Sequence, residues 1–262
     1  MTRIIATANQ KGGVGKTTLA INLSSGLARA NPDLRVLLVD ADPQANATAV
    51  LLGIPFAAGP RTTTDTIYEV LVDQAPLDTA LQRLELDADS GAVLDILPSH
   101  LDLASAELEL VNIFERERRL QRALAPVQAR YDYIIIDCPP SLGLLTLNAL
   151  MAATEVLIPV EPGIFPLIGL NLLNRTIAMV RQSNAGLHIL GVVPTLQDRT
   201  ALARDTIEQL TQAFGDRLLP AIPRRVAVGE AHTAGADIFT YDANSDSAEA
   251  FAALLQEVMR RG

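Results

Sequence analysis

Apolar residues along this chain fall into short continuous runs, and longer amphipathic stretches separate the runs. Continuous apolar runs of this length are typical of strands buried on both faces of a sheet. The pattern predicts strands at residues 4–8, 36–39, 93–97, 133–136, 156–160 and 189–193, and helices at residues 16–29, 102–129, 167–182, 201–214 and 245–260. The alternation of strands and helices predicts an α/β fold, a mostly parallel twisted central sheet with helices on both faces.

The segments between these elements predict loops and turns. Residues 53–66 are rich in Gly, Pro and Thr, and we expect a surface loop there. Residues 87–91 predict a turn, and no internal repeat is present. A length of 262 residues fits one large α/β domain better than two small ones, so we expect residues 1–262 to form a single domain.

The composition of the chain limits the classes of protein to which it can belong. The formal net charge of −9 gives no global attraction to DNA or anionic lipid, so any DNA contact must come from a local arginine patch. A single cysteine, Cys138, excludes an internal disulfide and a cysteine-ligated zinc or iron–sulfur site within one chain. No signal peptide precedes the first strand, and no run approaches the roughly 18 apolar residues of a membrane span. A cytoplasmic protein is expected.

Lysine occurs only at positions 11 and 16, within the glycine-rich segment 10–18. A coding bias toward arginine explains the missing surface lysines, but not two that remain five residues apart in one loop. A compact ammonium suits a phosphate cradle better than a wide guanidinium does. The two lysines therefore indicate phosphate chemistry at this loop.

The same segment matches the end of the phosphate-loop pattern G-x-x-x-x-G-K-[ST], except that Gln10 stands at the leading glycine. Backbone N–H groups of such a loop surround phosphate, Lys16 would reach the β- and γ-phosphates, and the Thr17 hydroxyl would bind Mg²⁺. The alternative is an ordinary glycine turn. The predicted nucleotide-binding residues are Lys11, Gly12, Gly13, Val14, Gly15, Lys16, Thr17 and Thr18.

Carboxylates follow two of the predicted strands. Asp40 and Asp42 come after the strand at residues 36–39, and Asp137 ends the strand at residues 133–136. Parallel sheets bind ligands at the carboxyl ends of their strands, so these side chains and the glycine loop should meet at one edge. A solvated turn and a strand-end cap are the alternatives. We expect Cys138, next to Asp137, to pack in the core.

Four segments together resemble the ParA/MinD family of deviant-Walker ATPases, and most of all the short Soj-type ParA. The resemblance covers residues 3 to about 258. Its segments read ANQKGGVGKTT (8–18), VDADPQANAT (39–48), YDYIIIDCPPSLG (131–143) and, more weakly, FPLIGL (165–170). The fold that the resemblance implies is a P-loop NTPase-like sandwich.

The resemblance also implies roles for residues. Lys11 would cross a dimer interface to the phosphates held by the other subunit, and Asp42 would orient the attacking water. Thr17, Asp40 and Asp137 would hold Mg²⁺, and Pro223 would lie near the adenine. ATP is favoured over GTP because neither lysine is placed for a guanine-reading Asn-Lys-x-Asp motif. The implied catalytic residues are Lys11, Lys16 and Asp42.

ParA-type proteins dimerise on ATP, bind DNA without sequence preference and respond to a ParB-like activator. The resemblance thus implies a nucleoid-associated chromosome- or plasmid-partitioning ATPase. Where the family has a second arginine this chain has Ala227, and it gains Arg225 instead. Solvated helix ends are the alternative for these arginines. The candidate DNA-binding residues are Arg199, Arg204, Arg224 and Arg225.

The sequence leaves one alternative function open and disfavours two others. A positioning ATPase that moves a protein cargo or a membrane-associated complex is the alternative function, and gene neighbours would separate the two. An electron-transferring relative would need two cysteines per chain. The apolar face of the helix at 245–260 favours core packing, so we expect no stable membrane association.

Residues 115–122 alternate Arg and Glu and predict an exposed, salt-bridged helix.

Overall fold

The computed structural model describes residues 1–60, 64–87, 91–163, 166–198 and 200–261. Its strands form a seven-stranded sheet in the order β3-β4-β2-β5-β1-β6-β7. Every neighbouring pair is parallel except β3 with β4. The predicted mostly parallel sheet is confirmed. The strands are β1 (Arg3–Thr7), β2 (Val36–Asp40), β3 (Gln82–Asp87), β4 (Ala92–Leu97), β5 (Tyr133–Asp137), β6 (Glu155–Val160) and β7 (His188–Pro194).

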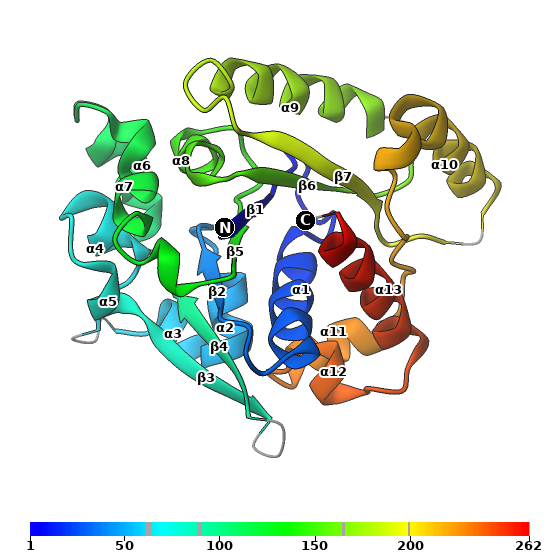
Figure 1. Ribbon diagram of the computed structural model, residues 1–262, viewed down its shortest axis with the longest axis horizontal. Helices are drawn as coiled ribbons and strands as arrows, with labels where there is room; N and C mark the ends of the chain where they lie inside the picture. The colour runs from blue at the N-terminus through cyan, green and yellow to red at the C-terminus, as the bar shows by residue number, and fades with distance from the viewer. Residues whose placement is uncertain (61–63, 88–90, 164–165, 199, 262) are drawn as a thin grey trace.

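Helices cover both faces of the sheet (Figure 1). The helices over one face are α1 (Lys16–Ala30), α2 (Asn46–Leu52), α11 (Val226–Thr233), α12 (Ile238–Tyr241) and α13 (Asp246–Arg260). Those over the other face are α4 (Ile67–Val72), α5 (Leu77–Ala80), α6 (Leu103–Leu110), α7 (Arg119–Leu124), α8 (Leu144–Ala152), α9 (Pro166–Val180) and α10 (Ala201–Phe214). Helix α3 (Ile54–Ala58) follows α2, and 3₁₀ turns lie at Arg116–Arg118, Gln128–Arg130 and Gly215–Arg217.

The strands divide their side chains between two hydrophobic cores. In β1, Ile4 faces the core under α4 to α10, while Ile5 faces the core under α1 and α13. The first and last long helices, blue and red in Figure 1, pack against each other. Gly26 of α1 lets α12 approach closely, because a Cβ there would lie 2.9 Å from the Phe239 ring, and Leu255 of α13 would lie 3.4 Å from the same Cβ. The residues predicted to form the apolar face of the last helix, Ala248, Phe251, Leu254, Leu255 and Val258, are all buried.

The prediction of a single helix at residues 102–129 is wrong. The chain forms α6, a 3₁₀ turn and α7 instead, and Glu115 between them has a left-handed backbone (φ 53°). Asn148 stabilises the break, because its amide donates to the Arg116 carbonyl (2.8 Å) and accepts from the Leu120 N–H (3.1 Å). A side chain from α8 thus supplies the hydrogen bonds that a continuous helix would have made.

Two further expectations need correction. The predicted loop at residues 53–66 contains α3, whose first turn includes Pro55, a residue suited to a helix start. The edge strand β3 was missed. It alternates apolar Leu84 and Leu86 with polar neighbours, which is the pattern of a half-buried antiparallel strand. Part of the predicted turn at residues 87–91 lies outside the described residues. Within the described ranges, no helix is long and apolar enough to span a bilayer.

Candidate nucleotide-binding site

The glycine-rich loop connects β1 to α1 at the carboxyl edge of the sheet. Gly13 (φ 73°) and Gly15 (φ 88°) have left-handed backbones, which glycine adopts without strain. Lys16 begins α1 and is buried, and its Nζ donates to the Lys11 carbonyl at 3.0 Å. Burial lowers the pKa of Lys16 and outweighs the opposing effect of nearby Asp137. The Lys16 ammonium therefore lies against the backbone of its own loop, where the oxygens of a bound phosphate would contact it.

Two residues that sequence reasoning missed hold this loop in place. Asn9 donates to the Pro159 carbonyl (2.7 Å) and accepts from the Lys11 N–H (3.0 Å). Thr195, just after β7, donates to the Val14 carbonyl at 2.6 Å. The loop is therefore tied to β6 and β7 before any ligand is present. Asn9 lies within the quoted motif, whereas nothing local marks Thr195.

Lys11 lies differently from Lys16. Its Nζ is 2.6 Å from a carboxylate oxygen of Glu161, and its side chain is 61% exposed. Arg224 donates to the other oxygen of Glu161 at 2.9 Å. The hydrogen bond from Lys11 is the main cause that lowers the pKa of Glu161, and both cations add to it. Glu161 was not predicted as a site residue, and it joins the loop lysine to a candidate DNA-binding arginine.

Asp40 and Asp137 are register neighbours on β2 and β5, and both are fully buried. One oxygen of Asp40 accepts from the N–H and hydroxyl of Thr48 (2.8 and 2.7 Å). Burial raises the pKa of Asp40 to about 6. Burial first, and then the Asp40 charge, raises the pKa of Asp137 well above its usual range. Two carboxyls buried this closely favour a cation between them.

Asp42 lies two residues beyond the end of β2 and is also buried. One oxygen accepts from the Gln44 N–H at 2.9 Å, and the Asp42 carbonyl accepts from the Ser99 hydroxyl at 2.8 Å. Burial raises the pKa of Asp42, although the Gln44 hydrogen bond and the charge of Lys16 oppose the shift. Ser99 was not predicted; with Gln44 it fixes the orientation of this acid.

The residues expected to hold Mg²⁺ fit a hard cation. The Oδ2 atom of Asp137 is buried and has no hydrogen-bond partner among the described residues. Asp40 lies beside it, Thr7 donates to the other oxygen, Oδ1, at 3.4 Å, and nearby Thr17 partly offsets the raised pKa of Asp137. Oxygen donors of this kind suit Mg²⁺. No group of three or more His, Cys, Asp or Glu side chains able to hold a metal occurs in the described part of the chain, so phosphate oxygens would have to complete the coordination.

A cavity of about 240 Å³ opens beside the loop, between α1, α11 and α13. Gly15 and Thr18 line it on one side, and Pro223 lines it on another. His232 also lines it; its Nε2 is buried without a described partner, and burial lowers its pKa. The cavity is large enough for a nucleotide base, and it brings Pro223 next to the glycine loop as expected.

The candidate DNA-binding arginines are only partly free. Arg204 and Arg225 line one shallow cavity together with Pro223. Arg224 forms ion pairs with Glu161 (2.9 Å) and Asp198 (3.3 Å), and Arg225 pairs with Asp246 (2.7 Å). Arg199 lies outside the described residues. The structure thus gathers three of the four arginines, two of them already neutralised.

The sequence matches known proteins along its whole length. Residues 2–189 match the family model described as an AAA domain. The chain is 45% identical over 262 residues to the chromosome partitioning protein ParA of Myxococcus xanthus, covering 99% of this chain and 88% of that protein. It is 44% identical over 265 residues to the sporulation initiation inhibitor protein Soj of Bacillus subtilis, covering 100% of both. The chain belongs to the ParA/Soj family of ATPases. It is an ATP hydrolase of the ParA type.

Solved structures agree with this assignment of a ParA-type fold. A plasmid partition protein from Borrelia burgdorferi B31, bound to AMPPNP, has a TM-score of 0.82 at 29% identity, covering 100% of both chains. A structure named cobyrinic acid a,c-diamide synthase, from Mycobacterium smegmatis with bound ADP and magnesium, has a TM-score of 0.81 at 36% identity, covering 99% of this chain and 95% of that one. These neighbours support nucleotide and Mg²⁺ binding by the present fold.

Proposed function

We propose that this ParA-type ATPase binds Mg²⁺ and ATP, forms a sandwich dimer of two copies, and then binds DNA without sequence preference. A ParB-like protein would stimulate slow hydrolysis and so release the dimer from the nucleoid. The output would be the positioning of chromosomal or plasmid DNA. The observation that carries the proposal is the difference between the two lysines: Lys16 is buried in its own loop, whereas Lys11 is exposed at the mouth of the site.

Each residue of the site has a proposed task. The loop N–H groups and Lys16 bind the β- and γ-phosphates, and Lys11 adds a cation to the nucleotide of the partner copy. Asp42 holds and orients the attacking water. A cation supplied in trans stabilises the charge that spreads over the γ-phosphate oxygens during phosphoryl transfer.

Thr17, Asp40 and Asp137 would hold Mg²⁺ together with phosphate oxygens. When bound, the metal ion supplies charge neutralisation at the β- and γ-phosphates. The buried, unpartnered Oδ2 of Asp137 supports this placement, because a carboxylate oxygen sealed from water needs a cation or a donor. Pro223 and the cavity beside it would take the adenine.

The proposed DNA surface consists of Arg204, Arg224 and Arg225, with Arg199 as a further candidate. Binding there would be directed at phosphates and would weaken steeply with salt. Because Glu161 pairs with both Lys11 and Arg224, movement of Lys11 to a partner's nucleotide would change the surroundings of Arg224. This contact offers a physical route from the nucleotide to the DNA surface.

DNA retention tests the proposal. Wild-type protein is measured with ATP, ADP and no nucleotide, at two salt concentrations, on two DNA sequences. We expect retention only with ATP, equal for both sequences and lost at high salt. The triple variant R204Q/R224Q/R225Q should lose retention, the single variant R204Q, which leaves the Arg224–Glu161 pair in place, should weaken it with basal ATPase unchanged, and the exposed Arg35→Gln serves as the control. Retention without nucleotide, or unchanged retention in the triple variant, would refute the DNA surface. No retention at all would favour a protein cargo.

A further inference from the structure

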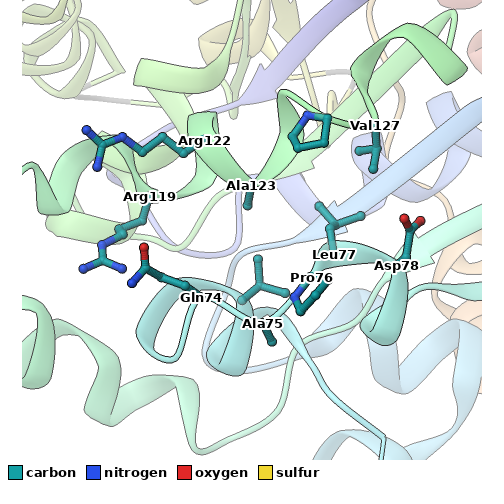
Figure 2. Close-up of a pocket in the computed structure, with 11 residues that line it drawn as sticks. Gln74, Ala75, Pro76, Leu77, Asp78, Arg119, Arg122, Ala123 and Val127 are labelled. Atoms are coloured by element: carbon teal, nitrogen blue, oxygen red, sulfur yellow. The ribbon is translucent and has the colours of Figure 1, made fainter.

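A second cavity lies away from the nucleotide site, between α7 and the segment that joins α4 to α5 (Figure 2). Its volume is about 280 Å³, enough to hold part of a small molecule in a partly open site. Apolar residues from both sides form much of its wall, among them Val70, Leu77, Ala123 and Val127. No residue of the glycine loop or of the aspartate segments lines it.

Arg119 brings an uncompensated charge to this cavity. Its Nε and Nη1 atoms are buried and have no hydrogen-bond partner among the described residues. This corrects the expectation that the 115–122 segment is simply an exposed, salt-bridged helix. Buried guanidinium donors without acceptors are costly, so such groups are usually paired with an anion. Figure 2 shows Arg119 extending from α7 toward Gln74, whereas Arg122 points away from that segment.

The other charged residues of the wall are already engaged. Arg122 forms an ion pair with Glu115, and Asp78 forms one with Arg130. Among the described residues, Asp78 forms its ion pair with Arg130 and none with Arg119. The cavity combines an apolar wall with a guanidinium that has two buried nitrogens without an acceptor among the described residues.

Gln74 occupies a position where glycine is usual. At the end of α4, the N–H groups of Asp73 and Ala75 both donate to the Glu69 carbonyl (3.0 and 3.1 Å), and Gln74 between them has φ 57°. Helix ends of this kind favour glycine at the left-handed residue, because a Cβ there is strained. The chain instead keeps an amide side chain at the cavity wall, despite that strain.

We propose that this cavity binds a small organic acid, a single carboxylate on an apolar body. The carboxylate would accept hydrogen bonds from Arg119 and from the amide of Gln74, and the apolar body would pack against Leu77, Ala123 and Val127. A carboxylate matches one free guanidinium in charge and hydrogen-bonding shape. An inorganic phosphate matches less well, because the wall is apolar and offers one free cation among its lining residues. The proposal is independent of the proposed function.

Calorimetric titration with three probes tests the site in the full chain. Hexanoate carries the charge and the apolar body, 1-hexanol lacks the charge, and inorganic phosphate lacks the apolar body. We expect hexanoate to bind more tightly than either by about tenfold or more, with saturation at one site per chain. Equal binding of hexanoate and hexanol, or binding by phosphate alone, would overturn the proposal.

Variants separate binding from folding. Arg119→Gln and the cavity-filling Ala123→Leu should each weaken hexanoate by about tenfold or more, while Arg83→Gln, an exposed arginine on β3, should not. Gln74→Gly should raise the melting temperature by relieving the positive φ, and should also weaken hexanoate. A merely structural Gln74 would give the first effect without the second. ATP binding, measured in parallel, should be unchanged in all four variants. Unaltered hexanoate binding in Arg119→Gln would refute the site.

Discussion

The Nζ atom of Lys11 lies 2.6 Å from the Glu161 carboxylate of its own chain. In the proposed dimer the same ammonium must instead reach the phosphates bound by the partner copy. The ion pair with Glu161 and the contact in trans exclude each other, so forming the dimer requires the first to break. An exposed pair of this kind contributes only about 0.2–1 kcal/mol, so ATP binding can overcome it.

Glu161→Gln should make dimerisation easier. Removing the carboxylate frees Lys11, so we expect the dimer to form at up to about fivefold lower protein concentration with ATP. Analytical ultracentrifugation over a concentration series measures this. Asp198→Asn is the matched control, because Asp198 pairs with Arg224, whereas the ion pair of Lys11 is with Glu161. A weaker dimer in Glu161→Gln would show that the carboxylate supports the interface and does not oppose it.

Replacing Lys16 and replacing Lys11 should impair different steps, ATP binding and dimerisation respectively. Lys16→Ala should weaken ATP binding by about 2–5 kcal/mol, because it removes a buried cation from the phosphates. Lys11→Ala should bind ATP to a single chain with nearly wild-type affinity, yet not dimerise. Titration with fluorescent ATP at low protein concentration separates the two. Retained ATP affinity in Lys16→Ala would contradict the phosphate cradle.

Asp42→Ala should bind ATP and form a long-lived dimer that hydrolyses slowly. A positioned acid or base typically contributes about 10²–10⁴-fold to such a reaction, and we expect a loss of that size in turnover. Size-exclusion chromatography with ATP and a phosphate-release assay measure both properties. Ser99→Ala, which removes a hydrogen bond to the Asp42 carbonyl, should have a smaller effect. If Asp42→Ala is a monomer with ATP, the proposed role in hydrolysis is wrong.

His232 should make the fold acid-sensitive. Burial lowers its pKa, so the folded chain holds a proton on this ring less tightly than the unfolded chain, which takes one up below about pH 6.5. The folding free energy is therefore unaffected by protonation of this histidine above about pH 6.5, and the fold becomes less stable as the pH falls below that value. His232→Gln should therefore lose less unfolding free energy between pH 7.5 and 5.5 than the wild type. Urea denaturation measures it, with exposed His188→Gln as the control. Equal losses would contradict the burial argument.

The edge at which the chemistry gathers could be predicted from sequence because the rule behind it is local. A buried strand that ends in an aspartate places that aspartate at the carboxyl edge of a parallel sheet, and Asp40 and Asp137 do lie opposite each other there. The long helices were also predictable, since their apolar periodicity extends over several turns.

The missed features depend on contacts between distant segments. The break before α7 is stabilised by Asn148, which lies 28 residues from Leu120, and the loop is anchored by Thr195, which lies 181 residues from Val14. No local pattern reports such pairs. The ion pair of Lys11 with Glu161 is of the same kind. Strand β3 is different, because its alternation of Leu84 and Leu86 with polar residues is a local pattern that the sequence itself carries.

Complementation between two inactive variants tests most directly whether Lys11 acts in trans. Lys11→Ala keeps its own phosphate cradle but lacks the ammonium for its partner, whereas Lys16→Ala lacks the cradle but keeps Lys11. In a mixed dimer, the nucleotide held by Lys11→Ala receives Lys11 from Lys16→Ala. We predict that each variant alone is inactive in phosphate release and that activity appears as Lys16→Ala is added to a fixed amount of Lys11→Ala. Two folded variants whose mixture stays inactive, or a Lys11→Ala protein that turns over alone at the wild-type rate, would contradict the account.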